Sequence, residues 1–396
     1  VKSGLNVGSR SFSGKGVNRS TYSGLGWRTF AVICGAAPLA FLGLFFFYPV
    51  INIFVSSLSQ GWTGFLDIVD SSRARNAIWF TTWQAAASTL VTVVIAMPCA
   101  ALMARTSGSA GVWLKALVTV PFVLPTIVVG GAFKELFEGL NGSVGFPNLN
   151  HTAGAIIVAH AFFNFAVVAR TVGAYWAGLD HQLEEQARTL GSSSSHVFWR
   201  VTWPRLKPAV LAAAAITFLF SFTSFGVVLV LGGLRQATIE TEIFRHAVVR
   251  GDLATSASMS VIQIGAVLCL VAVTSRLERR TSVSTQMMRS TIAPMRTTTK
   301  TTIAVFSLIF LGSPVAVMIE RSLKAADSYG LQNYAALFEK IPQLPTTSAE
   351  ALGNSMIYAL VATAMALCLG VVCAMTIVAR RDTVGRFFDL AATLPL

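Results

Sequence analysis

Charged residues are scarce in this chain, and their scarcity excludes an ordinary soluble domain. Of its 396 residues only 12% are Asp, Glu, Lys or Arg, whereas 54% are hydrophobic and the mean hydropathy is +0.65. Soluble domains carry roughly twice that share of charge. Apolar runs of about 20 residues, the length that crosses a bilayer, recur along the sequence. These features predict an all-α, polytopic membrane protein built as a helical bundle.

Cysteine is also rare, and its placement argues against a metal site. All five cysteines lie inside apolar segments, and none has metal-ligand spacing to another Cys or to a His. No nucleophile-and-base constellation appears either, so the sequence does not predict an enzyme. We expect no bound metal, and we expect small packing roles for Cys34, Cys99, Cys269, Cys368 and Cys373.

A phosphate-binding loop for ATP is missing as well. The tail piece Gly14-Lys15-Gly16 lacks the earlier Gly of a Walker A motif and the Ser or Thr that follows its Lys. We therefore expect this chain to bind no cofactor. If ATP powers its function, ATP and Mg²⁺ are bound and hydrolysed by a separate subunit.

The basic residues follow the pattern that sets membrane topology. The net charge is +13, and Arg and Lys gather in the loops after the second, fourth, sixth and eighth predicted spans. Basic loops stay on the cytoplasmic side, so we predict a multi-pass protein of the bacterial inner membrane with a cytoplasmic N-terminus. No basic face is interleaved with exposed aromatics, which argues against nucleic-acid binding. The predicted spans are residues 27–58, 79–103, 112–136, 153–179, 209–231, 254–274, 302–319 and 352–378, and a ninth begins near Phe387.

A weak internal repeat divides the chain into two parallel halves. Residues 76–105 and 354–380 both open with Asn and close an apolar span with Ala-Arg, and a Thr-x-Pro follows each copy. The second copy stops at Leu396, where we expect a truncation. We predict a disordered cytoplasmic tail at 1–26, a first six-span repeat at 27–276, a cytoplasmic linker at 277–301 and the start of a second repeat at 302–396.

The polar loop 184–208, between the fourth and fifth spans, is the most informative stretch. It concentrates charged and hydrogen-bonding side chains in a chain that has few of them. We predict two short helices, 184–190 and 196–201, joined by a turn in which Gly191 tolerates a positive φ.

Four further residues of this loop define where its second helix begins and ends. Ser194 or Ser195 is placed to cap the second helix, because a serine hydroxyl accepts a hydrogen bond from a free N–H of the first turn. Pro204 and Pro208 are expected to stop the helix before the fifth span, because proline has no N–H to donate.

The spacing of this loop resembles the EAA loop of bacterial ABC importer permeases. That loop runs Glu-Ala-Ala, three residues, Gly, nine residues, Ile-x-Leu-Pro, and Glu185, Gly191 and Pro204 fit it without a gap. Three positions depart from the pattern: Gln186 stands for Ala, Val201 for Ile and Trp203 for Leu.

The resemblance implies that the loop docks onto an ATP-binding cassette ATPase homodimer and transmits its closure. It also implies an extracytoplasmic solute-binding protein. Phe198, Trp199 and Trp203 would be aromatic anchors of the kind that often dominate interfaces. The alternative is an interfacial amphipathic helix whose Trp side chains lie at the headgroup level. The expected docking residues are Glu184, Glu185, Ala187, Arg188, Gly191, Val201, Trp203 and Pro204.

Other segments resemble one branch of that family, the two-repeat permeases for thiamine and ferric iron. The likeness covers roughly residues 76–280 and part of 354–396. It implies that the solute is thiamine, ferric iron or a similar small molecule. The segments that carry it are 120–125, 160–164, 220–228, 231–233 and 237–243.

Polar residues inside the predicted spans are costly in a bilayer and tend to line pathways or bundle interiors. His160 and Asn164 are four apart and therefore share a helix face. One interpretation is a translocation path for a small polar or cationic solute; the other is hydrogen bonding between helices, which is favoured for the hydroxyls. The path candidates are His160, Asn164, Arg170, Ser221, Thr223, Ser224 and Gln263.

Pro121 and Pro125 are candidate gate residues. Two prolines four apart leave backbone carbonyls unpaired and bend a span. The alternative is an irregular start of the third span, because proline is tolerated in the first turn of a helix.

Two other function classes compete with an importer permease. A secondary transporter tends to have intramembrane carboxylates or broken helices for coupling ions, but Glu135 is the only Asp or Glu in predicted spans one to eight. A membrane enzyme would need a cluster of His, Asp or Glu near one interface, and the sequence has none.

Overall fold

The computed structural model describes residues 36–58, 68, 70–145, 147, 149–233, 236–282, 295–325, 328–340, 342 and 345–379. Two predictions lie wholly outside these residues, the disordered tail 1–26 and the ninth span near Phe387. The predicted linker 277–301 lies partly outside them, at 283–294, and its two ends are helical. The chain divides into two compact units, one of Val1–Asn52 with Leu337–Leu396 and one of Ile53–Ala336. The candidate site lies in the second unit.

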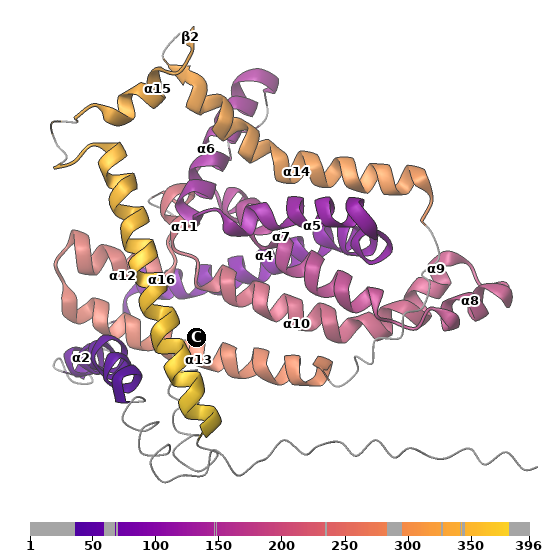
Figure 1. Cartoon of the computed structure of the whole chain (residues 1–396), viewed down its shortest axis with the longest axis horizontal. Coiled ribbons are helices and arrows are strands. Elements are labelled where there is room, and N and C mark those ends of the chain that lie inside the picture. The colour runs from indigo at the N-terminus through magenta and orange to yellow at the C-terminus, as the bar shows by residue number, and fades with distance from the viewer. Residues whose placement is uncertain are drawn as a thin grey trace, which may run out of the picture. The chain divides into compact units, whose positions relative to one another are not determined.

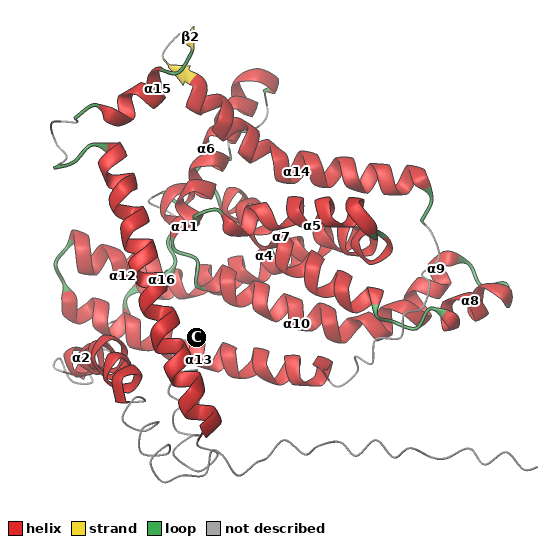
Figure 2. Ribbon diagram, viewed as in Figure 1, coloured by secondary structure: helices red, strands yellow, loops and turns green. Residues whose placement is uncertain are grey.

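The described elements are almost all helices (Figure 2). One two-residue hairpin is present, in which β1 (Lys324–Ala325) pairs antiparallel with β2 (Ser328–Tyr329). The long helices are α4 (Ser72–Arg105), α5 (Gly108–Val123), α6 (Thr126–Val144), α7 (Ala153–Ala177), α10 (Trp203–Phe222), α13 (Leu253–Ser282), α14 (Thr297–Leu323) and α16 (Ser348–Ala379). The shorter ones are η1 (Gly43–Phe47), α2 (Tyr48–Leu58), α8 (Gln182–Thr189), α9 (Ser194–Val197), η2 (Phe198–Thr202), α11 (Gly226–Leu231), α12 (Ile239–Phe244), η3 (Arg245–Val249), α15 (Gln332–Ala335) and η4 (Ala336–Phe338).

Length and composition mark many of these helices as membrane spans. Within the described part of the chain, seven helices are long and apolar enough to cross a bilayer, and one bent pair of helices is an eighth candidate span. The protein is therefore an all-α membrane bundle, as the sequence predicts. The predicted repeat pairs α4 with α16, which have 34 and 32 residues; the repeat itself stays a prediction.

The third span is not the single helix expected over 112–136. It is the bent pair α5 and α6, whose axes meet at 98°. The break falls at Leu124, whose ψ of 139° is extended. Pro125 causes it, because the residue before a proline is disfavoured in the helical region. Pro121 stays inside α5 and is buried.

The fifth span also differs from the expected 209–231. A continuous helical run from Ser194 to Phe222 includes α9, the π-turn η2 and α10. Neither Pro204 nor Pro208 stops it. Pro204 lies in the first turn of α10, where its missing N–H costs little. The chain breaks later, at residues 223–225, and α11 follows.

Small side chains let the central helices α4 and α7 pack closely. Ala96, Cys99 and Ala100 of α4 are buried, as are five alanines of α7. A Cβ on Gly173 of α7 would lie 3.2 Å from the carbonyl oxygen of Ala100. Small residues at such interfaces allow helix backbones to approach in membranes.

α14 packs on this bundle through aromatic and ionic contacts. The ring of Phe310 lies 5.9 Å from Phe165 and 6.3 Å from Phe162, both buried in α7. Arg321 forms a 2.9 Å ion pair with Glu135 of α6. In Figure 1, α8 and α9 project at one end of this unit, beyond α7 and α10, whereas α11 and α12 lie toward the opposite end.

Candidate functional site

The projecting loop contains the two short helices that the sequence predicts, α8 and α9. The turn between them has Gly191 at φ +85°, in the left-handed region that glycine adopts at little cost. The cap of α9 differs from the prediction. Ser193, rather than Ser194 or Ser195, accepts the hydrogen bond from the N–H of His196, because α9 begins at Ser194, two residues earlier than expected.

A buried carboxylate holds this loop to the base of α10. The hydroxyl of Thr202 donates to Glu184 Oε1 at 2.7 Å, and Nδ1 of His181 lies 3.6 Å from the same oxygen. Glu184 is only 7% exposed. Arg205 adds a second link by donating to the carbonyl of Asp180 at 2.7 Å. Glu184 therefore faces inward and braces the loop, whereas the sequence analysis placed it on the docking surface.

The exposed residues of α8 and of the turn after it include both charged residues and leucines. Glu185 and Arg188 are exposed, as a docking surface requires. Leu183 and Leu190 are 46% and 87% exposed, and the sequence analysis missed both. The sequence does contain a pattern that could have found them, because they are the only two leucines in the polar stretch 180–195 and lie seven residues apart.

The aromatic residues of the loop form one cluster with graded exposure. The ring of Phe198 lies 6.1 Å from Trp176, 5.2 Å from Trp199 and 6.3 Å from Trp203. Trp199 is 59% exposed, whereas Phe198 and Trp203 are half-buried. Trp199 is therefore the predicted anchor that the loop presents most openly. Among the other predicted docking residues, Pro204 is exposed, and Ala187 and Val201 are half-buried.

A cavity of about 260 Å³ lies against the inner side of this loop. Its lining includes Arg105, Glu184, Arg188, Phe198 and Met295. The guanidinium of Arg105 also lies 4.9 Å from the ring centre of Trp176, a cation–π contact. The α8–α9 loop, the end of α4 and Met295, two residues before α14, thus meet at one place.

The polar residues inside the bundle fall into two groups, and the first joins helices. Nδ2 of Asn164 donates to Ser221 Oγ at 3.2 Å, and Nε2 of Gln84 donates to the Ser221 carbonyl at 3.0 Å. His160 Nδ1 lies 3.2 Å from Ser88 Oγ. All five are buried, and they link α4, α7 and α10. The sequence analysis did not single out Gln84, although it is a lone amide in an apolar span.

The second group lines a cavity of about 280 Å³ where two helix breaks meet. His160, Thr223 and Ser224 line it together with Thr126, the residue after Pro125. The breaks at 124–125 and 223–225 are in close contact, because a Cβ on Gly226 would lie 2.4 Å from Thr126 Oγ1.

The remaining path candidates lie elsewhere. Arg170 donates to Thr119 Oγ1 at 3.1 Å, in a different cavity. Gln263 donates to Glu240 Oε1 at 3.4 Å, at the α12–α13 contact. Burial raises the pKa of Glu240 to about 7. Within the described part of the chain, no group of three or more His, Cys, Asp or Glu is placed to hold a metal ion.

Comparison with known proteins identifies the family that shares this architecture. Residues 93–283 match the family of binding-protein-dependent transport system inner membrane components. The molybdenum transport system permease protein ModB of Mycobacterium bovis is 30% identical over 220 residues, which is 53% of this chain and 82% of that protein. The chain belongs to this family. It is thus a multi-pass inner-membrane permease of the ABC importer type.

Two further members of the family show how far the likeness extends. The sulfate transport system permease protein CysT of Salmonella typhimurium is 30% identical over 49% of this chain and 72% of that protein. The thiamine transport system permease protein ThiP of Brucella abortus is 28% identical over 80% of this chain and 59% of that protein. The structure of a bacterial alginate ABC transporter chain aligns with a TM-score of 0.51 at 17% identity, covering 64% of this chain and 96% of that chain, and this likeness shows the fold.

Proposed function

We propose that this chain is the membrane permease of an ATP-driven importer and moves a small solute inward by alternating access. ATP is hydrolysed by a separate ATPase homodimer that docks on the α8–α9 loop, and a solute-binding protein delivers solute on the other side. The basic loops favour a cytoplasmic location for α8, α9 and the N-terminus.

One structural observation carries this proposal. The loop exposes Leu183, Glu185 and Leu190, whereas Glu184 is buried. Exposed leucines on a charged surface are typical of a protein interface. The inward brace makes the loop a rigid lever on α10, so that movement of a docked partner is transmitted to that span. An interfacial helix would instead place its apolar residues toward the bilayer.

Thiamine is the solute that we propose to test first. The thiamine permease aligns over 80% of this chain, whereas the molybdenum permease aligns over 53%. The longer alignment extends into the region of the predicted second repeat. Sulfate and molybdate are the alternatives, since the relatives named for them match about half of this chain.

The experiment is co-purification of the ATPase with Glu185→Lys. Reversing an exposed charge in the docking surface should reduce ATPase recovery several-fold, because charge pairs across an interface lose their attraction. Glu339→Lys, the same reversal at an exposed residue in the other unit, is the matched control. Equal recovery with both variants would contradict the docking proposal.

A further inference from the structure

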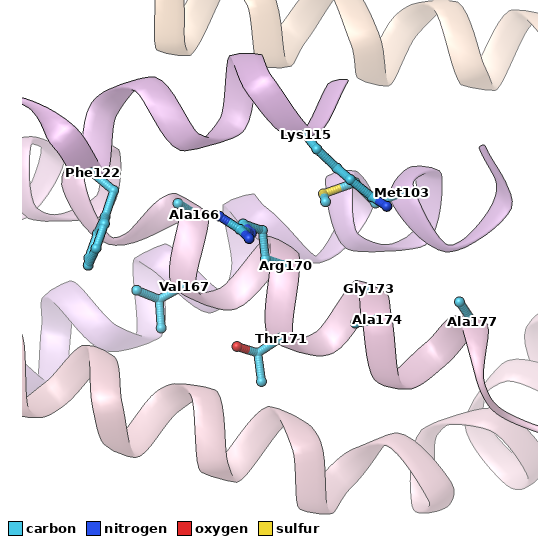
Figure 3. A pocket seen from close by; sticks show the side chains of 10 residues that line it. All are labelled: Met103, Lys115, Phe122, Ala166, Val167, Arg170, Thr171, Gly173, Ala174 and Ala177. Atoms are coloured by element: carbon cyan, nitrogen blue, oxygen red, sulfur yellow. The ribbon is translucent and has the colours of Figure 1, made fainter. Parts of the chain in front are cut away.

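A third cavity, of about 560 Å³, lies between α5 and α7 beside the end of α4. Most of its lining is apolar, including Phe122, Val167 and Met103. Figure 3 shows Lys115 and Phe122 extending from α5 toward α7, with Arg170 between them in this view. Two cationic side chains therefore share a largely apolar pocket that is open at the surface of the bundle, where Lys115, Phe122 and Arg170 are exposed.

Neither cation is neutralised by the pocket. Its ten lining residues, all of them described, include no Asp or Glu. Arg170 donates one hydrogen bond, to Thr119 Oγ1 at 3.1 Å, which leaves most of its guanidinium donors available. Lys115 is exposed and forms no ion pair with any described residue. Because two cations and no carboxylate line it, the pocket favours an anion.

The two cations lie at the same depth. Lys115 is seven residues after the start of α5 at Gly108, and Arg170 is seven residues before the end of α7 at Ala177. Both helix ends adjoin the basic loops, and seven residues of helix span about 10 Å. α4, with 34 residues, is about 51 Å long and exceeds the bilayer core of about 30 Å by roughly 10 Å at each end. The cations thus lie near the headgroup phosphates of one leaflet.

We propose that the Lys115–Arg170 pocket binds a phosphate-type oxyanion. Arg170 presents a planar fork that matches two oxygens of such an anion, and Lys115 supplies a compact second charge. The apolar lining around Phe122 and Val167 accommodates an acyl chain, so a phospholipid phosphate at this depth fills both parts of the pocket. A free oxyanion satisfies the two cations alone.

The site would make the packing of α5 against α7 sensitive to an anion near the bent span. Its assignment to the cytoplasmic leaflet rests on the orientation proposed above, but anion binding itself does not. Accessibility of Ser195→Cys to a membrane-impermeant thiol reagent in intact cells and in inverted vesicles tests the orientation separately.

The test uses the full chain with its accompanying subunits, in nanodiscs of phosphatidylcholine and phosphatidylglycerol. Native mass spectrometry counts the phosphatidylglycerol retained after release from the disc. We expect Lys115→Gln and Arg170→Gln each to lower retention several-fold, and the double variant to abolish it. Lys300→Gln, a lysine in the first turn of α14 outside the pocket, is the matched control and should match the wild type.

A second arm distinguishes the source of the oxyanion. In lipid-free detergent, inorganic phosphate and sulfate are titrated while the melting temperature is measured. Stabilisation that Arg170→Gln abolishes would assign the pocket to a free oxyanion, whereas selective phosphatidylglycerol retention assigns it to lipid. Arg170→Lys keeps the charge and removes the fork, so partial binding in a well-folded variant excludes misfolding as the cause. Equal phosphatidylglycerol retention in wild type and double variant, with no anion-dependent stabilisation, overturns the proposal.

Discussion

The hydroxyl of Thr202 donates a 2.7 Å hydrogen bond to the carboxylate of Glu184, and both side chains are buried. The bond joins α8 to the π-turn that leads directly into α10. Hydrogen bonds to a carboxylate are stronger than those between neutral groups. This contact therefore couples the position of the docking helix to the fifth span, where the second helix break lies.

Thr202→Val should loosen this coupling. Valine keeps the shape of threonine but leaves a buried carboxylate without its hydroxyl partner, which costs about 1–3 kcal/mol. We expect faster amide exchange across residues 182–190 and a lower ATPase rate in the assembled complex. Thr189→Val is the matched control, because the Thr189 hydroxyl bonds only within α8, to the Gln186 carbonyl. Unchanged amide exchange in Thr202→Val would show that the hydrogen bond between Thr202 and Glu184 does not hold α8 in place.

Gly191→Asp should abolish uptake while the protein remains in the membrane. The φ of +85° is strained for an L side chain, at a cost of about 1 kcal/mol or more, and a negative charge is added to the docking turn. Gly251→Asp is the control, because Gly251 also has a positive φ and open space around it but precedes α13. Uptake and membrane content should be measured together. Equal uptake by both variants would show that the turn at Gly191 is not needed for transport.

The sequence predicts some features of the loop well because they are local. The left-handed turn follows from a glycine at a fixed spacing within a polar stretch. The cap does not, because Ser192–Ser195 are four serines in a row and each can cap a helix. The start of the fifth span is missed for a related reason. Pro204 is compatible either with the end of a helix or with its first turn, and only tertiary packing decides between them.

Contacts between distant residues could not be predicted from one sequence. The hydroxyl of Ser221 accepts a hydrogen bond from Asn164, 57 residues away, and its carbonyl accepts one from Gln84, 137 residues away. Polarity alone marks all three as candidates for either a path or a helix contact. The cavity where Thr126 meets Gly226 likewise depends on two helix breaks, and the sequence analysis anticipated a bend only at the first.

His160 and Asn164 should behave differently although they share a helix face. His160 lines the cavity at the two breaks, whereas Asn164 bonds to Ser221. We expect His160→Leu to lower the binding-protein-stimulated ATPase rate with normal assembly. Asn164→Leu should lower the melting temperature of the complex, because the Ser221 hydroxyl loses its partner at a cost of about 1–3 kcal/mol. A melting temperature for Asn164→Leu that equals the wild type would return Asn164 to the path candidates.

Glu240 should make the stability of the protein depend on pH. Burial raises its pKa from 4.5 to about 7, opposed by the hydrogen bond from Gln263. Because the folded state holds the proton more tightly, the contribution of Glu240 to stability is complete below about pH 4.5 and is lost as the pH rises through 7. The difference in pKa between 4.5 and about 7 corresponds to about 3.5 kcal/mol, and because Glu240 is only half-buried, solvent screening lowers the loss to about 2 kcal/mol. The melting temperature of the wild type should therefore fall between pH 5 and pH 8.

Glu240→Gln should flatten that fall, because glutamine stays neutral. Glu339→Gln, which alters an exposed carboxylate, should retain the wild-type slope; an unchanged slope in Glu240→Gln would assign the pH dependence to other groups.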